Sequence, residues 1–304
     1  MARFTVENWA PEYGSPIEES GGEDLRNVEV DVGVELPLER WEPQSPVGRT
    51  MPDSIGFVDG VRRIDARVWF ANGDGSSMGI CASFAAGVVR CAARAEVAAI
   101  VVGRGVFARL PAEPIETAQG TYQLFGTATD EFDALNNEVQ QQMGRLEREV
   151  AATAGGLDLL VLDGPLTGRE SIPGAVGYIK SHRAAYLPEQ GRNVVAALGA
   201  GQRTPLFLTQ TTWSRYSWYL RLPGGQGHPW AGVVRCEVTT GRTIAEVQAV
   251  ADVTAAVLPR YASQEQRDTR APQNLLPIGG LEQQLRHRLG DRDLMVRALR
   301  RAAG

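Results

Sequence analysis

Three runs of apolar residues between positions 55 and 91 predict β-strands. Their sequences are IGFVDGV (55–61), RIDARVWFA (63–71) and GICASFAAGVVRC (79–91), with turn-forming segments such as NGDGSSMG between them. Short connections of this kind favour an antiparallel meander. The first run contains Asp59-Gly60, a pair that is also typical of a tight hairpin turn. Asp59 is therefore either a turn residue or a carboxylate with a chemical role.

A helix is predicted over residues 129–154. Its apolar positions recur every three or four residues, which is the period of an amphipathic helix; they are Phe132, Leu135, Val139, Met143, Leu146 and Val150. The run LDLLVLDGPL (157–166) follows directly, and its continuous apolar character is expected of a strand covered on both faces in a parallel arrangement. Three strands, a helix and a buried strand are the opening of a ribonuclease H-like α/β fold.

The rest of the chain extends this architecture. Residues 193–200, 243–258 and 279–302 predict helices, and apolar runs within 204–239 predict further strands. Residues 1–50 are rich in Pro, Gly and Glu, and their one alternating stretch, residues 28–41, predicts a strand or arm that packs on the body. We expect an N-terminal extension over residues 1–50 and one domain over residues 51–304, with a mixed sheet flanked by helices.

Composition narrows the class of protein. The 304 residues, 43% of them hydrophobic, can bury a substantial core, and the net charge of -5 argues against a surface that binds nucleic acid everywhere. No stretch approaches the roughly 20 apolar residues of a membrane span, and the N-terminus lacks the apolar segment of a signal peptide, so we expect a cytoplasmic protein. Cys81, Cys91 and Cys236 lack metal-site spacing and are expected to be core residues.

Two aspartates occur in the same local pattern. Asp163 in VLDG repeats Asp59 in FVDG, and in a ribonuclease H-like sheet their strands would be parallel neighbours about 4.8 Å apart. Such carboxylates repel one another unless a cation lies between them. Glu147, at roughly 60° from the centre of the helical apolar stripe, is a better third ligand than Glu149 at roughly 100°, although it could be an ordinary solvated residue. The set predicts Mn²⁺ or Mg²⁺, with two ions as the usual arrangement for phosphodiester cleavage.

The basic residues have an unusual composition. Of 31 basic residues, Lys180 is the only lysine. A lysine kept in a chain that otherwise uses arginine suggests a site where a compact ammonium is needed, for example to neutralise a scissile phosphate. A structural ion pair or chance survival is the alternative.

The segment WSRYSWYLRL (213–222) offers a candidate surface for DNA. Strand alternation places aromatic and basic side chains together on one face, namely Trp213, Arg215, Tyr219 and Arg221. Aromatic rings and guanidinium groups stack bases and hold phosphates of single strands. The same face could instead form packing inside a dimer. A second basic cluster, at residues 286–301, could bind phosphate or complement the dipole of a helix end.

Several motifs in order resemble one family. FVDG, RLERE before LLVLDGPL, GYIKSH, RTPLF, SRYSWYLRLP and PWAGVVRCE together resemble the NurA nuclease domain over most of residues 50–290. The resemblance implies a ribonuclease H-like fold, manganese-dependent exonuclease and endonuclease activity on DNA, a homodimer, and association with the hexameric HerA translocase in the processing of DNA ends. It also implies that Asp59, Glu147 and Asp163 occupy the metal-binding positions.

The chain departs from the family pattern at two places. Val61 follows Asp59-Gly60 where the family often has serine, and APQNLLPIGG (271–280) lacks the histidine of archaeal members. Asn274 or Asp268 could take the place of that histidine. These departures motivate an alternative, a non-catalytic subunit that keeps the fold as a dimeric docking scaffold for the translocase. A third hypothesis is an enzyme on the same fold that acts on RNA.

Overall fold

The computed structural model describes residues 4–6, 28–46, 51–72, 75–109, 111–180, 186–224, 230–264, 266–268 and 270–304. The strands are β1 (Phe4–Val6), β2 (Glu29–Asp31), β3 (Ile55–Asn72), β4 (Gly75–Cys91), β5 (Ala95–Arg109), β6 (Ile115–Thr117), β7 (Gly120–Thr127), β8 (Leu159–Asp163), β9 (Ala175–Ile179), β10 (Phe207–Gln210), β11 (Ser214–Arg221) and β12 (Val233–Thr239). The α-helices are α1 (Phe132–Thr153), α2 (Glu189–Ala197), α3 (Ile244–Val257), α4 (Leu276–Arg288) and α5 (Arg292–Ala303), and short 3-10 helices occur at Leu38–Arg40 and Leu258–Tyr261.

One mixed sheet runs through the molecule. Within the described ranges it has 12 strands in the order β2-β10-β11-β12-β9-β8-β3-β4-β5-β7-β6, with β1 paired to β3. The strands β3, β4 and β5 are antiparallel, whereas β8 is parallel to β3 and β9 is parallel to β8. Because α1 lies between β7 and β8 in the chain, it supplies the crossover that a parallel neighbour requires. The predicted α/β class, a mixed sheet flanked by helices, is confirmed.

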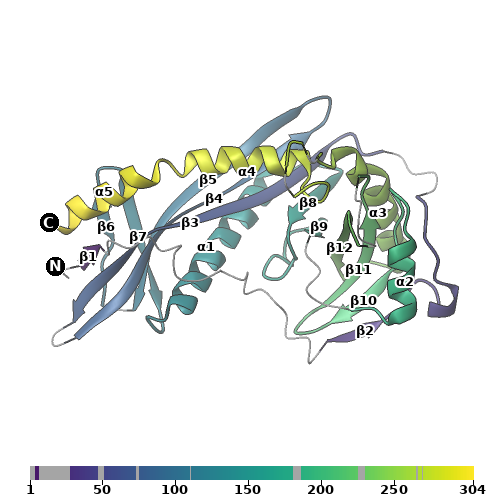
Figure 1. The fold of residues 1–304 in the computed structure, drawn as a ribbon, viewed down its shortest axis with the longest axis horizontal. Helices are drawn as coiled ribbons and strands as arrows, with labels where there is room; N and C mark the ends of the chain where they lie inside the picture. Colours follow the sequence, from purple (N-terminus) through teal and green to yellow (C-terminus); the bar gives the residue numbers. More distant parts are fainter. Residues whose placement is uncertain are drawn as a thin grey trace.

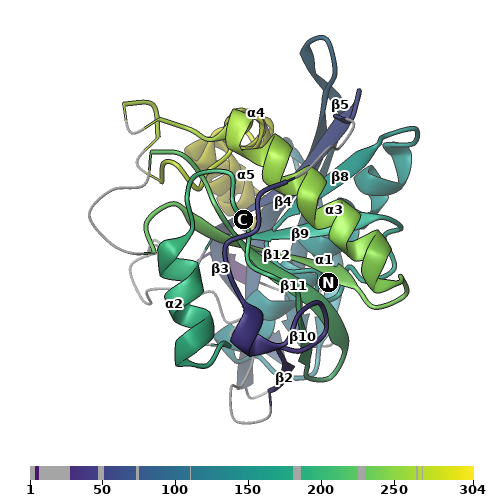
Figure 2. The same cartoon turned by 90° about the vertical axis from the view of Figure 1, so that its right-hand side faces the viewer.

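Helices cover both faces of the central strands. Apolar residues of α1, among them Leu135 and Val139, pack against Ile80 and Phe84 of β4, which explains the predicted amphipathic period. The opposite face carries α3 and α4, while α2 stands apart beside β10 and β11 (Figures 1 and 2). The sheet is therefore buried on both sides at its centre, which is where the parallel strand β8 lies.

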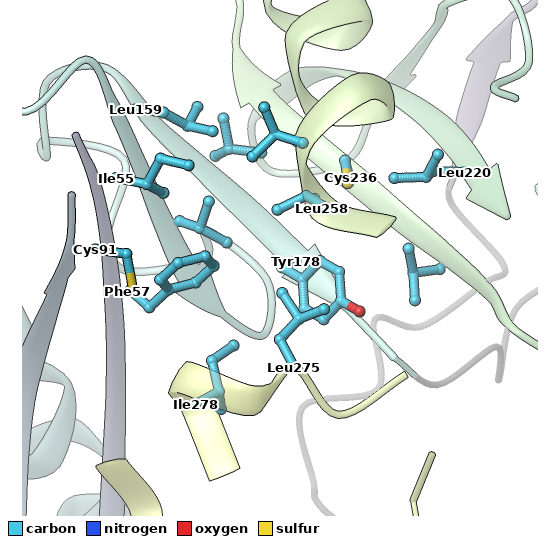
Figure 3. Close-up of a cluster of buried hydrophobic side chains, with 14 of the residues drawn as sticks. Ile55, Phe57, Cys91, Leu159, Tyr178, Leu220, Cys236, Leu258, Leu275 and Ile278 are labelled. Atoms are coloured by element: carbon cyan, nitrogen blue, oxygen red, sulfur yellow. The ribbon is translucent and has the colours of Figure 1, made fainter. Parts of the chain in front are cut away.

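The larger hydrophobic core lies between the sheet and the helices α3 and α4 (Figure 3). Phe57 of β3 and Tyr178 of β9 pack there with Leu275 and Ile278, at the start of α4. The Tyr178 hydroxyl also donates a 2.6 Å hydrogen bond to the carbonyl oxygen of Gln273. This core anchors the segment that leads into α4 against β3 and β9.

The predicted meander is wrong in its details. The first two predicted runs form one long strand, β3, which pairs with β4 from Ile55↔Cys91 to Asn72↔Gly75. Asp59 is therefore neither a turn residue nor the end of its strand. Two charged residues are accommodated within β3, because Arg63 pairs with the buried Asp65 at 2.7 Å. The third antiparallel strand is β5. The strands β5, β7 and β9 were not predicted from the sequence.

Other elements follow the prediction more closely. The helix predicted over 279–302 is two helices, because Gly290 adopts a φ of +83° and the Asp291 side chain then caps α5 by accepting from the N–H of Leu294. The arm packs on the body as expected: β2 pairs with β10, and Trp41 is buried. The three cysteines are buried and free. Among the described residues, no helix combines the length and apolar character needed to span a membrane.

Candidate metal centre

Asp59 and Asp163 lie side by side on two parallel strands. β3 and β8 pair in register up to Val58 and Leu162, so the next residue on each strand is an aspartate. Backbones of paired strands lie about 4.8 Å apart. Asp59 is 7% exposed, and the side chain of Asp163 is 17% exposed. The structure thus brings together the two carboxylates that the repeated sequence pattern singled out.

Glu147 reaches the same place from α1, and Gly60 leaves the room for it. A Cβ atom at Gly60 would lie 2.7 Å from Oε1 of Glu147 and 2.9 Å from Cγ of Met143. Glu147 is 4% exposed, whereas Glu149 is exposed on the outer side of the same helix. Glu149, the second candidate from the helical wheel, is therefore not part of this site.

Two cations already pair with these carboxylates. Nη1 of Arg169 donates to Oε2 of Glu147 at 2.8 Å and to the carbonyl oxygen of Asp163 at 3.0 Å. Nζ of Lys180 lies 2.7 Å from Oδ2 of Asp163. These ion pairs orient Glu147 and Asp163, whose like charges would otherwise repel one another.

A chain of hydrogen bonds holds Lys180 from behind. Its ammonium also donates to Oδ1 of Asn274 at 3.1 Å, and the Asn274 amide in turn donates to Oδ2 of Asp268 at 2.5 Å. Asn274 is fully buried. Its two neighbours in the chain are held in place, Gln273 by the hydrogen bond from Tyr178 and Leu275 by packing in the core. Asn274 and Asp268, the two candidates for a replacement of the family's histidine, thus reach the acidic residues through Lys180.

The pKa values of the acidic residues reflect burial and mutual repulsion. Burial raises the pKa of Asp59 well above its ordinary value; Asp163 raises it further, Lys180 lowers it, and Glu147 adds to the rise. Burial also raises the pKa of Glu147, an effect that Arg169 opposes and Asp163 reinforces. A divalent cation at this place would favour the ionised form of both groups.

The oxygen atoms here suit a hard divalent cation. Oδ1 of Asp163 is buried and has no hydrogen-bond partner among the described residues. Asp59 accepts a 2.7 Å hydrogen bond from the N–H of its neighbour Gly60. Carboxylate oxygens are the ligands that Mn²⁺ and Mg²⁺ prefer. Within the described ranges, however, no group of three or more His, Cys, Asp or Glu side chains is arranged to hold a metal ion. Asp59 and Asp163 have the oxygen chemistry that such an ion prefers, whereas Glu147 is engaged by Arg169.

Two of the four residues predicted to bind DNA are buried. Arg215 is 1% exposed, and its Nε lies 3.1 Å from Oε2 of the buried Glu237. Tyr219 is also 1% exposed, and its ring stacks on Phe207 with centroids 5.6 Å apart. The prediction for Arg215 and Tyr219 is wrong, because this face of β11 is covered by other parts of the same chain.

The other two members of that predicted surface are engaged within the chain. Arg221 donates to the carbonyl oxygens of Ala231, at 2.7 Å, and Val195, at 3.3 Å. The ring of Trp213 lies 5.0 Å from the guanidinium carbon of Arg215. These contacts hold β11 against its neighbours and leave the four residues without a shared open face.

The C-terminal basic cluster lies apart from the carboxylates. Arg286 pairs with Glu282 at 2.8 Å. Arg297 and Arg301 line a surface groove between β6 and α5, together with Glu116. Figure 1 shows α5 and β6 at the end of the sheet away from β8. This cluster is therefore not part of the candidate metal centre.

Sequence reasoning missed Arg169. The residue lies in the loop that follows β8, in the stretch GPLTGRE, and is one of many arginines in the chain. Gly164, with a φ of +84°, turns the chain so that Arg169 returns towards α1. The sequence contains a signal for the turn, the glycine after Asp163, but none for the carboxylate that the arginine meets.

Comparisons with known proteins were made for the whole chain. No model of a known protein family matches it. A search of curated proteins likewise finds no match.

Proposed function

We propose that this protein is a metal-dependent nuclease that hydrolyses phosphodiester bonds in DNA. The observation that carries the proposal is that Asp59, Asp163 and Glu147 lie near one another. They come from two parallel strands and a crossover helix. The strand order β5-β4-β3-β8-β9, with β8 parallel to β3, supports a ribonuclease H-like arrangement. In that arrangement the first and fourth strands are parallel neighbours and deliver carboxylates to one edge.

Asp59 and Asp163 would hold the metal ion, Mn²⁺ or Mg²⁺, with Glu147 beside them. When bound, such an ion activates water as a nucleophile and stabilises the leaving oxygen of a phosphodiester. Arg169 keeps Glu147 oriented towards the strands through its 2.8 Å ion pair. Lys180 directs its ammonium at Asp163, where it would offset the negative charge of a scissile phosphate.

The substrate class and partners rest on the resemblance to the NurA domain. They are DNA ends, a HerA-type hexameric translocase and a second copy of the chain. The net charge of -5 agrees with a nuclease that receives its strand from a motor and needs little affinity for DNA of its own. Arg215 and Tyr219 are buried and so cannot contribute to a DNA-binding surface. This agrees with a low affinity of the chain itself for DNA.

A nuclease assay tests the proposal directly. Labelled single-stranded and double-stranded DNA, and RNA of the same sequence, would be incubated with the full chain and Mn²⁺. We expect degradation of DNA, and a loss of about 100-fold or more in Asp59→Asn and Asp163→Asn, because a ligand of the ion is removed. Glu147→Gln should also lose activity, whereas its matched control Glu149→Gln, on the exposed side of α1, should keep it.

Two results would contradict the proposal. One is an inert wild-type chain, both alone and with a HerA-type translocase. The other is undiminished degradation in both aspartate variants. Preference for RNA over DNA would instead favour the RNA-directed hypothesis.

One observation favours the second candidate, a non-catalytic docking scaffold. Arg169 and Lys180 already pair with two of the carboxylates, as they would in a site that no longer binds metal. A scaffold should bind the translocase equally well in the presence of Mn²⁺ or a chelator, and should show no nuclease activity in the complex. Activity that appears in the complex and disappears in Asp59→Asn would exclude the scaffold.

A further inference from the structure

Negative charges outnumber positive charges at the candidate metal centre. Among the described residues, three carboxylates lie near one another there, Asp59, Glu147 and Asp163, and two cations pair with them, Arg169 and Lys180. With all five groups ionised, their charges sum to about -1, and a buried ionised group requires compensation. One divalent ion together with the single negative charge of a phosphodiester would bring the site to neutrality. A second divalent ion would leave two uncompensated positive charges in a largely buried place.

Lys180 occupies one side of Asp163 and is held there. Its Nζ donates to Oδ2 of Asp163 at 2.7 Å, whereas Oδ1 of the same carboxylate is buried and has no partner in the part of the chain that the structure describes. The amide of Asn274, itself bound to Asp268, fixes the ammonium from behind at 3.1 Å. The two oxygens of Asp163 therefore differ: one is engaged by a cation of the protein, and the other is open to a ligand.

Arg169 is held with equal firmness on the other side. Besides Glu147, its guanidinium donates to the carbonyl oxygens of Asp163 and Pro165, and the residue is buried. Losing these contacts would leave the guanidinium group of a buried residue without its partners, which is costly. Glu147 is thus neutralised by an internal cation that cannot easily leave.

We propose, on the basis of the proposed metal-dependent function, that the site binds one divalent ion and that Lys180 takes the place of a second. The ion would lie between Asp59 and the free Oδ1 of Asp163. This differs from the two ions expected from the sequence. It also assigns a reason to the only lysine among the 31 basic residues: a compact ammonium can occupy a metal position that a planar guanidinium does not fit.

Counting Mn²⁺ bound per chain tests the proposal without reference to activity. The full-length protein would be titrated with Mn²⁺, and the free ion measured by electron paramagnetic resonance. We expect one ion per chain in the wild type and two in Lys180→Met, because the loss of the ammonium frees Oδ2 of Asp163 and removes a positive charge. Arg94→Gln, which removes one charge from an exposed residue in the turn between β4 and β5, should still bind one ion. Circular dichroism checks that Lys180→Met is folded.

Each other outcome overturns the proposal in a distinct way. Two ions in the wild type would refute the single-ion site but leave the proposed nuclease function intact. One ion in a folded Lys180→Met would refute the role given to Lys180. No binding by the wild type at millimolar Mn²⁺ would refute both this inference and the proposed metal dependence.

Discussion

At the scale of the residue, Gly60 decides whether Glu147 can approach the aspartates. A glycine within a strand lets another group come near the backbone. The structure identifies that group as the carboxylate of Glu147, 2.7 Å from where a Cβ atom would be. A side chain at this position would have to displace Glu147 or Met143.

We predict that Gly60→Ala weakens Mn²⁺ binding at least tenfold and lowers the free energy of unfolding by about 1–3 kcal/mol, the usual cost of overpacking. Calorimetric titration and chemical denaturation measure the two effects. Gly144→Ala on α1 is the matched control. A Cβ atom at Gly144 would lie 3.9 Å from its nearest neighbour, an atom of the Arg148 side chain, and alanine favours a helix. Unchanged Mn²⁺ affinity in Gly60→Ala would show that Glu147 is not needed near the ion.

Asp59 gives a second prediction, on pH and stability. Burial and the nearby carboxylates raise its pKa in the folded state, so the folded protein binds more protons than the unfolded chain between the ordinary and the raised value. In the presence of a chelator, stability should therefore fall as the pH rises through that range.

Asp59→Asn removes this titration. We expect the variant to be more stable than the wild type near neutral pH without divalent ions, and Mn²⁺ to raise the unfolding temperature of the wild type only. Thermal unfolding monitored from pH 4 to pH 8 provides the measurement. A variant that is less stable than the wild type throughout would speak against a buried, repelled carboxylate.

At the scale of the element, β11 shows where alternation in the sequence misleads. The alternation correctly separates two faces, and Trp218, Leu220 and Leu222 are buried as expected of core residues. The second face is covered too, by residues of the N-terminal arm and α2 such as Trp41 and Val195. Whether a face of aromatic and basic residues is open depends on segments remote in the chain, which alternation within one strand does not reveal.

The buried ion pair of β11 leads to a stability prediction. Arg215→Ala should lower the free energy of unfolding by about 3–5 kcal/mol, because it leaves Glu237 with less compensation in a fully buried position. Chemical denaturation is the measurement, with Arg94→Ala as an exposed control that should change stability by less than about 0.5 kcal/mol. A small effect of Arg215→Ala would mean that Arg235, whose Nη2 lies 3.3 Å from the same oxygen of Glu237, compensates the carboxylate by itself.

At the scale of the whole molecule, the sequence predicts the layers better than the connections. The amphipathic period of α1 and the apolar run of β8 depend on local pattern, and both are found within a few residues of the expected bounds. The sequence predicted two runs, 55–61 and 63–71, where the fold has the one long strand β3. In the fold, Arg62 donates to Asn136 at 2.5 Å and Arg63 pairs with Asp65 at 2.7 Å. Such partners depend on tertiary structure.

Some residues of the candidate site could be predicted from the sequence and others could not. Asp59 and Asp163 could be found because two strands carry the same motif and parallel pairing brings strand positions into register. Arg169 and the link from Lys180 through Asn274 could not, because they join loops whose positions are set by the turn at Gly164 and by the core around Leu275. Sequence pattern thus locates the acids, and the fold supplies the cations that balance them.

The most direct test of a metal ion held by Asp59 and Asp163 is a crystal of the full chain soaked in Mn²⁺, with the anomalous signal of the metal recorded. We predict one peak per chain, within about 2.0–2.4 Å of carboxylate oxygens of both Asp59 and Asp163. Lys180 should remain paired with the other oxygen of Asp163. A crystal saturated with Mn²⁺ that shows no peak beside these two aspartates would contradict the central claim.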